Sequence, residues 1–266
     1  MADDATTVDL DHRLQGTRAL VTGAGQGVGE GIARHLAAGG SEVLVNDFDA
    51  GRAARVAEDI VAAGGQARPV PFDVTDLGAV AAAVGEHGPI GILVNNAGNA
   101  GVSGFGMPES FVDTGPDDWE RFLAVNLHGV LHCTHAVLPG MIDAGWGRVI
   151  TIVSDAARAP EKGMAVYGAA KAAAAAFGRG IAAEVARHGI TVNNIALGTM
   201  RTPLTAALWD EPGLDEQRRA ILSSYLVRRP GEPSDAAWLV AALASPRSGW
   251  ITGQTIPVDG GYTAAL

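Results

Sequence analysis

The sequence has little of what disulfide-stabilised, membrane-spanning or nucleic-acid-binding proteins require. It contains one cysteine, Cys133, so no disulfide can form within the chain. Glycine, proline or charge interrupts every apolar run well short of the roughly 20 residues that a membrane helix needs. Lys and Arg number 19 against 29 Asp and Glu, and the net charge of −10 argues against a basic surface for nucleic-acid phosphates. We therefore expect a cytoplasmic protein with no membrane or nucleic-acid partner.

What the sequence does contain is a regular alternation of short apolar runs with longer, Ala-rich stretches. The apolar runs predict strands over residues 18–22, 42–46, 68–72, 91–95, 148–154, 190–196 and 255–258. The Ala-rich stretches predict helices over 27–39, 50–64, 75–88, 116–145, the segment around 167–171, and 234–245. This order is typical of an α/β Rossmann fold, a doubly wound parallel sheet of about seven strands with helices on both faces.

Two segments depart from this alternation. Residues 1–13 are acidic and lack periodicity, which predicts a flexible tail ahead of a single domain over residues 14–266. Residues 198–233 combine helical pieces with prolines and charges. We interpret this second segment as a lid over a substrate site.

The turn after the first predicted strand, "VTGAGQGVGEGIARHL", has glycines at 23, 25, 27 and 29. Such a turn directs free N–H groups and the positive end of the following helix at a phosphate. The strict G-x-G-x-x-G spacing is not met, because Val28 stands at the sixth position counted from Gly23. Glycine-rich turns also occur for structural reasons alone. The place of this one, after the first strand, favours a pyrophosphate site.

Asp47 follows the second predicted strand, where a carboxylate accepts hydrogen bonds from the adenosine ribose of a dinucleotide. A 2′-phosphate there would be repelled, and neither Gln26 nor Phe48 supplies a cation to offset the repulsion. The sequence therefore predicts NAD(H) in preference to NADP(H). The alternative for Asp47 is a turn or helix-capping residue.

Tyr167 and Lys171 stand four residues apart in an Ala-rich helix and therefore share one helix face. A nearby ammonium favours the phenolate and lowers the pKa of a tyrosine, so the pair can exchange a proton with an alcohol. Ser154 ends the fifth predicted strand, where open α/β sheets bind ligands, and its hydroxyl can hold a substrate oxygen. A buried tyrosine beside an exposed lysine is the structural alternative for an isolated pair of this kind.

These motifs together resemble the classical short-chain dehydrogenases/reductases. The resemblance rests on "TGAGQGVG", "NNAG" at 95–98, Asn126, Ser154 and "YGAAK" at 167–171, and it covers nearly the whole chain from Leu14. It implies that Tyr167 is the catalytic acid/base and that Ser154 orients the substrate oxygen. Lys171 would bind the nicotinamide ribose and lower the tyrosine pKa, and Asn126 would support a water linked to Lys171.

The resemblance also implies a set of cofactor contacts, with Asp73 at the adenine and "NNAG" on the cofactor floor. The expected set is Gly23, Gln26, Gly27, Val28, Gly29, Asp47, Phe48, Asp73, Val74, Asn95, Ala97, Gly98, Tyr167, Lys171, Gly198 and Thr202. One departure stands in "LGTMRT", where Leu197 replaces the family's proline while Gly198 and Thr202 remain. We expect cofactor binding to survive this change and the entry to the lid to be more flexible.

Three histidines in the fourth predicted helix have a spacing that can assemble a metal site: His128, His132 and His135. At about 100° per residue they project away from Asn126, so we expect no metal there. In the family this helix packs against a second subunit, which implies a homotetramer or a homodimer. Cys133, beside the histidines, is expected in the core.

The substrate is less defined than the reaction. Apolar residues expected near the nicotinamide suggest a pocket for a ring or an acyl chain, although any of them could be ordinary lid packing: Phe105, Met107, Met164, Leu197, Met200, Leu204, Leu208 and Trp209. Cationic residues in the same region could meet coenzyme A phosphates or be surface charge: Arg158, Lys162, Arg201, Arg218, Arg219, Arg228 and Arg229. Within the family, the chain looks most like the branch acting on hydroxyacyl-CoA thioesters and cyclic secondary alcohols.

We therefore predict an NAD(H)-dependent oxidoreductase that interconverts a secondary alcohol and a ketone through Ser154, Tyr167 and Lys171. One alternative is a 3-oxoacyl-thioester reductase that uses NADPH, against which Asp47 weighs. An alternative of another class is a non-catalytic dinucleotide-binding sensor, against which the complete Ser-Tyr-Lys set weighs.

Overall fold

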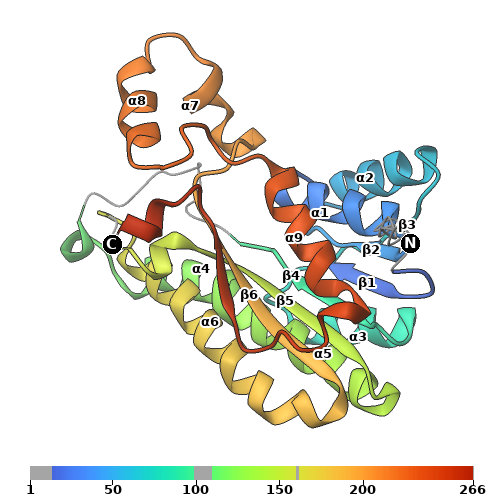
Figure 1. The fold of residues 1–266 in the computed structure, drawn as a ribbon. Helices are drawn as coiled ribbons and strands as arrows, with labels where there is room; N and C mark the ends of the chain where they lie inside the picture. Colours follow the sequence, from blue (N-terminus) through green and yellow to red (C-terminus); the bar gives the residue numbers. More distant parts are fainter. Residues whose placement is uncertain (1–13, 99–109, 160–161, 266) are drawn as a thin grey trace, which may run out of the picture.

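A computed structural model of the protein describes residues 14–98, 110–159 and 162–265. The predicted tail over residues 1–13 lies outside this range. Figure 1 shows the described chain as a central sheet between two layers of helices, with two short helices of the lid standing apart from them. Among the described residues, no helix combines the length and apolar character needed to span a bilayer.

Seven parallel strands form the sheet, in the order β3-β2-β1-β4-β5-β6-β7. Their bounds are β1 Arg18–Val21, β2 Glu42–Val45, β3 Gln66–Pro69, β4 Ile92–Asn95, β5 Gly147–Ser154, β6 Ile190–Leu197 and β7 Thr255–Val258. The strand order reverses direction between β1 and β4, so a crevice opens there at the carboxyl edge of the sheet. The predicted fold class is confirmed, and each predicted strand overlaps an observed one.

Helices cover both faces of the sheet, as Figure 1 shows. Their bounds are α1 Gly27–Ala38, α2 Ala50–Ala62, α3 Leu77–His87, α4 Pro116–Leu123, α5 Gly129–Ala144, α6 Ala165–Val185, α7 Ala206–Asp210, α8 Asp215–Ser223 and α9 Pro233–Ala244. One core cluster joins the sheet to α1, α2 and α9. A second joins the opposite face to α3, α5 and α6. The inner strands β2, β1, β4, β5 and β6 are therefore buried on both sides, which explains their continuous apolar runs, whereas the edge strand β3 is mostly exposed.

The structure corrects the single helix predicted over 116–145. A π-helical turn, Ala124–His128, separates α4 from α5. The apolar periodicity continues through this turn, so the sequence pattern alone does not reveal it. Asn126 lies inside the turn and is fully buried. Turns of this kind occur frequently at functional sites.

Candidate active site

The glycine-rich turn is held against the neighbouring strand by side-chain hydrogen bonds. Nδ2 of Asn96 donates to the backbone oxygens of Thr22 and Gly23, at 2.9 and 3.0 Å. The Thr22 hydroxyl accepts from the backbone N–H groups of Asn96 and Ala97, both at 3.0 Å. A Cβ on Gly29 would lie 2.2 Å from the Gly23 oxygen, so only glycine fits there. The turn and the start of α1 are thereby fixed at the crevice.

A cavity of about 610 Å³ lies in front of this turn. Most of the predicted cofactor contacts line it: Gly23, Gln26, Gly27, Val28, Gly29, Asp47, Phe48, Asp73, Val74, Ala97, Gly98 and Thr202. Free N–H groups at the start of α1 suit a pyrophosphate, and a buried carboxylate stands at the end of β2. The residues present therefore fit a dinucleotide, and we name this space the cofactor cavity.

Two neighbouring asparagines at the end of β4 point to different sides. Asn95, a predicted cofactor contact, is buried, and its Nδ2 donates to the hydroxyls of Thr134 and Thr151 at 3.1 and 3.4 Å. It lines neither the cofactor cavity nor its neighbour. Asn96 lines both. The alternation of side chains at the strand end is the signal that distinguishes them.

Asp47 is 4% exposed, and the protein supplies donors to both of its carboxylate oxygens. Oδ2 accepts from the N–H of Gly25 at 3.2 Å, and Oδ1 from the N–H of Asp49 at 3.0 Å. Nη2 of Arg52, in the first turn of α2, also donates to Oδ1, at 2.9 Å. Arg52 lines the cofactor cavity and is a residue that sequence reasoning missed. Arg52 is five residues beyond Asp47 and so lies outside the expected motif. The first turn of α2 nevertheless brings its side chain back to the Asp47 carboxylate.

A second cavity, of about 190 Å³, adjoins the first and shares Val28, Asn96, Gly98, Thr202 and Leu204 with it. It is lined by the predicted catalytic residues Ser154, Tyr167 and Lys171 together with Gly198 and several lid residues. We name it the reaction cavity. Apolar side chains close part of it, as expected: Met164, Leu197, Met200 and Leu204.

Lys171 is buried beneath the reaction cavity. Its Nζ donates to the backbone oxygen of Ile152 at 3.0 Å and lies 5.9 Å from the centroid of the Tyr167 ring. Burial lowers the pKa of Lys171 to about 8. A Cβ on Gly98 would lie 3.0 Å from this Nζ and 2.9 Å from Oδ1 of Asn126. The lysine and the π-helical asparagine therefore converge on the same end of "NNAG".

The Ser154 hydroxyl lies at the end of β5 and is already engaged. It donates to Oδ1 of Asp155 at 3.1 Å and accepts from the N–H of Ala156 at 3.2 Å. A hydroxyl rotates freely, so it can donate to a substrate oxygen instead. The Tyr167 ring packs edge-on against Phe122 of α4, with centroids 6.5 Å apart.

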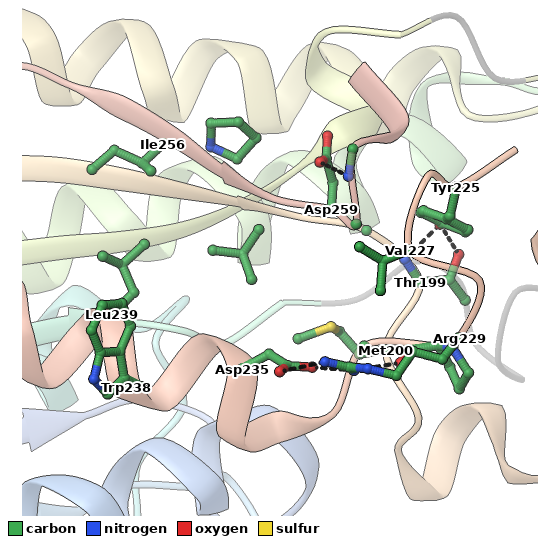
Figure 2. A pocket seen from close by; sticks show the side chains of 17 residues that line it. Thr199, Met200, Tyr225, Val227, Arg229, Asp235, Trp238, Leu239, Ile256 and Asp259 are labelled. Atoms are coloured by element: carbon green, nitrogen blue, oxygen red, sulfur yellow. Dashed lines mark hydrogen bonds and ion pairs between the residues drawn. The ribbon is translucent and has the colours of Figure 1, made fainter. Parts of the chain in front are cut away.

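The two ends of the predicted lid meet beside a further cavity, which shares Gly198, Thr199 and Met200 with the reaction cavity. Figure 2 shows the cavity of about 460 Å³ at this place. The Tyr225 hydroxyl donates to Oγ1 of Thr199 at 2.8 Å and accepts from the Thr199 N–H at 2.9 Å. Arg229 pairs with Asp235 of α9 at 2.6 Å. The first pair of contacts joins the exit of the lid to its entry, and the second joins the exit to α9 (Figure 2).

The arginines within the lid bond mostly to the lid itself. Arg201 pairs with Asp210, and Arg218 donates to the backbone oxygens of Trp209 and Glu211 at 3.0 and 2.6 Å. Arg228 donates to Ser223 O at 2.8 Å, and Arg219 to Asp215 O at 3.3 Å. Arg158 and Lys162 are exposed. Phe105 and Met107 lie outside the described residues.

The three histidines of the fourth predicted helix do not converge. His128 lies 3.6 Å from a carboxylate oxygen of Glu120, and Nδ1 of His132 lies 3.0 Å from the Val74 backbone oxygen. Over the described ranges, no three His, Cys, Asp or Glu side chains gather as a metal site requires. Cys133 is fully buried, and burial raises the pKa of its thiol to about 12.

The chain is similar over nearly its whole length to known oxidoreductases. A family model described as enoyl-(acyl carrier protein) reductase matches residues 23–263. The short-chain reductase protein NovJ of Streptomyces niveus is 39% identical, with 98% of each chain covered. Two solved structures align closely.

One is a gluconate 5-dehydrogenase from Burkholderia cenocepacia in complex with NADP and tartrate, with a TM-score of 0.87, 35% identity, and coverage of 97% and 99% of the two chains. The other is a 7α-hydroxysteroid dehydrogenase complexed with NADH and 7-oxo glycochenodeoxycholic acid, with a TM-score of 0.85, 34% identity, and coverage of 94% and 96%. The glycine-rich turn, the Ser-Tyr-Lys cavity and these similarities agree, and the chain belongs to the classical short-chain dehydrogenases/reductases, oxidoreductases that use NAD(P)(H).

Proposed function

We propose that the protein is an NAD(H)-preferring dehydrogenase that interconverts a secondary alcohol and a ketone on an apolar ring or acyl substrate. One observation carries the proposal. Ser154, Tyr167 and Lys171 line one cavity, and that cavity shares Asn96 and Gly98 with the space that fits a dinucleotide. A substrate carbinol in the reaction cavity would therefore lie beside the cofactor.

We expect the residues that line the cofactor cavity to hold different chemical groups of the cofactor. The glycine-rich turn and the start of α1 suit the pyrophosphate, and Asp47 suits the adenosine ribose, which favours NAD(H). Asp73 also lines the cavity and would contact the adenine, while Thr202 lines both this cavity and the reaction cavity. When bound, NAD⁺ supplies the acceptor for a hydride.

The side chains of the reaction cavity supply the acid/base step. Ser154 Oγ holds the substrate oxygen, and the Tyr167 phenolate accepts the hydroxyl proton as the carbinol carbon loses its hydride, which leaves the ketone. Lys171 favours the phenolate when it carries its proton. The burial that lowers the pKa of Lys171 to about 8 keeps the two protonation states of this lysine close in energy near neutral pH.

For the substrate, the contacts of the lid favour a free apolar alcohol over a coenzyme A thioester. Arg201 and Arg218 are engaged with Asp210 and with backbone oxygens of the lid, so a thioester's phosphates would have to displace these contacts. The side chains that close the reaction cavity are apolar at Met164, Leu197 and Met200. An apolar ring fits this lining better than a polar chain does.

We also propose a homotetramer or homodimer in the cytoplasm. A cavity of about 370 Å³, apolar in most of its lining, lies on the outer surface formed by α5 and α6, with Leu131, Leu138 and Phe177 among its residues. A second subunit that packs on this surface would bury it. The unpaired, buried Cys133 agrees with a reducing compartment.

The experiment presents cyclic hydroxy compounds, both free and as coenzyme A thioesters, with NAD⁺ and with NADP⁺, and follows reduced nicotinamide. We expect turnover of free cyclic alcohols with a higher kcat/KM for NAD⁺. Turnover of thioesters alone would contradict the substrate class. Binding of NADH without turnover of any secondary alcohol or ketone would favour the sensor over the enzyme.

A further inference from the structure

Arg52 occupies an unusual position at the adenosine end of the cofactor cavity. Its guanidinium donates one hydrogen bond, from Nη2, to the Asp47 carboxylate at 2.9 Å, and packs over the Phe48 ring with 4.9 Å to the centroid. The Arg52 side chain is 30% exposed and lines the cavity. A fixed cation therefore stands beside the carboxylate that faces the ribose.

The hydrogen-bonding capacity of this guanidinium is mostly unused. Nε is buried and has no hydrogen-bond partner among the described residues, since Oδ2 of Asp49 is 3.7 Å away. A guanidinium carries five N–H donors arranged to match a phosphate or a carboxylate. Asp47 takes only the bond from Nη2. An incompletely satisfied cation on a cavity wall points to an anionic ligand group.

Arg55, on the same helix, shows what a fully engaged arginine looks like here. It donates to the Gly25 backbone oxygen at 2.8 Å and pairs with Glu30 and Asp59 at 2.8 and 3.3 Å. It does not line the cofactor cavity. The two arginines therefore carry the same charge within one helical turn of each other, and of the two only Arg52 lines the cofactor cavity.

We propose that Arg52 determines how far NAD(H) is preferred: it pairs with a 2′-phosphate and so admits NADP(H) as a second cofactor. The inference rests on the proposed function, in which Asp47 faces the adenosine ribose. A carboxylate there repels a 2′-phosphate, but Arg52 neutralises that carboxylate and still has donors to offer. The site therefore discriminates less strongly between NAD(H) and NADP(H) than an isolated aspartate would.

The test measures dissociation constants for NADH and NADPH by fluorescence titration of the full chain. It adds adenosine 2′,5′-diphosphate and adenosine 5′-diphosphate as probes of the adenosine end alone. In Arg52→Gln we expect NADPH and the 2′,5′-diphosphate to bind at least ~10-fold more weakly, as loss of a charge-assisted hydrogen bond predicts. NADH should change by less than ~3-fold. Arg52→Lys, which keeps the charge without the fork, should retain part of the NADPH affinity.

Arg55→Gln is the control for charge, because it removes the same charge from the same helix at a residue that does not line the cavity. Since Arg55 also donates to the Gly25 backbone oxygen, its loss should weaken both dinucleotides alike and leave the ratio of their dissociation constants unchanged. The same rise in the NADPH dissociation constant relative to that of NADH in Arg52→Gln and Arg55→Gln would overturn the inference, since only overall charge would then matter. A ratio of the NADPH to the NADH dissociation constant that stays at the wild-type value in Arg52→Gln would overturn the inference as well. Failure of both dinucleotides to bind the wild-type protein would instead contradict the proposed function.

Discussion

Asn96 and Tyr225 each hold a loop at the carboxyl edge of the sheet, but in different surroundings. Asn96 fixes the glycine-rich turn through two backbone oxygens, from a half-buried position between the two cavities. Tyr225 fixes the lid at Thr199, and the rest of the lid is held by partly exposed arginines such as Arg218 and Arg229. Exposed ion pairs contribute little to stability, so substitutions in the lid should destabilise the protein only slightly. Substitutions in the glycine-rich turn should destabilise it more. The residues of the turn therefore define the class of reaction better than the residues of the lid define the substrate.

The largest expected effect on stability concerns Lys171, whose side chain is buried beneath the reaction cavity. Burial lowers its pKa from 10.5 to about 8, so between these values the unfolded chain binds more protons and stability rises with pH. Below pH 8 both states are protonated and the cost of burial is fully present. We expect the cofactor-free wild type to gain about 2–3 kcal/mol over Lys171→Met between pH 7 and 10.

Urea unfolding of both proteins at the two pH values measures this difference. Parallel changes in the two proteins would contradict the burial of a titrating lysine. Because Lys171→Met also removes the charge beside Tyr167, turnover should fall in the same variant.

The next prediction tests the hydrogen bonds by which Asn96 holds the glycine-rich turn. Asn96→Leu leaves the oxygens of Thr22 and Gly23 without a donor, which costs about 1–3 kcal/mol for buried groups. We expect a lower Tm and a roughly tenfold weaker NADH affinity, since the turn shapes the cofactor cavity.

Asn95→Leu is the control, since that side chain bonds to Thr134 and Thr151 away from both cavities. It should lower Tm while NADH affinity stays within about threefold of wild type. Equal losses of NADH affinity in the two variants would show that the affinity follows overall stability and does not depend on the hydrogen bonds from Asn96 to the turn.

The smallest expected effect concerns the lid. Tyr225→Phe removes the hydrogen bonds to the N–H and the hydroxyl of Thr199. We expect KM for the alcohol to rise a few-fold, corresponding to about 1 kcal/mol, with NADH affinity unchanged. A loss of NADH affinity as large as that of Asn96→Leu would contradict the separation of the two regions.

The sequence predicts the fold well because the five inner strands are apolar runs bounded by glycine or polar residues and are buried on both faces. It also identifies Ser154, Tyr167 and Lys171, because helix spacing and a strand end decide where they point. It does not separate Asn95 from Asn96, since the pleat at the end of β4 decides which one faces the cavity. It misses Arg52, whose approach to Asp47 depends on how the first turn of α2 returns over the loop. The π-helical turn around Asn126 is hidden because apolar residues continue through it.

The most direct test of the central claim compares wild type and Tyr167→Phe with one secondary alcohol that the wild type oxidises. NADH affinity and kcat are measured on the same preparations. We expect kcat to fall by about 10²–10⁴-fold, as for loss of a general acid/base, while the NADH dissociation constant stays within about twofold of the wild-type value. Undiminished turnover in Tyr167→Phe would contradict the proposed mechanism.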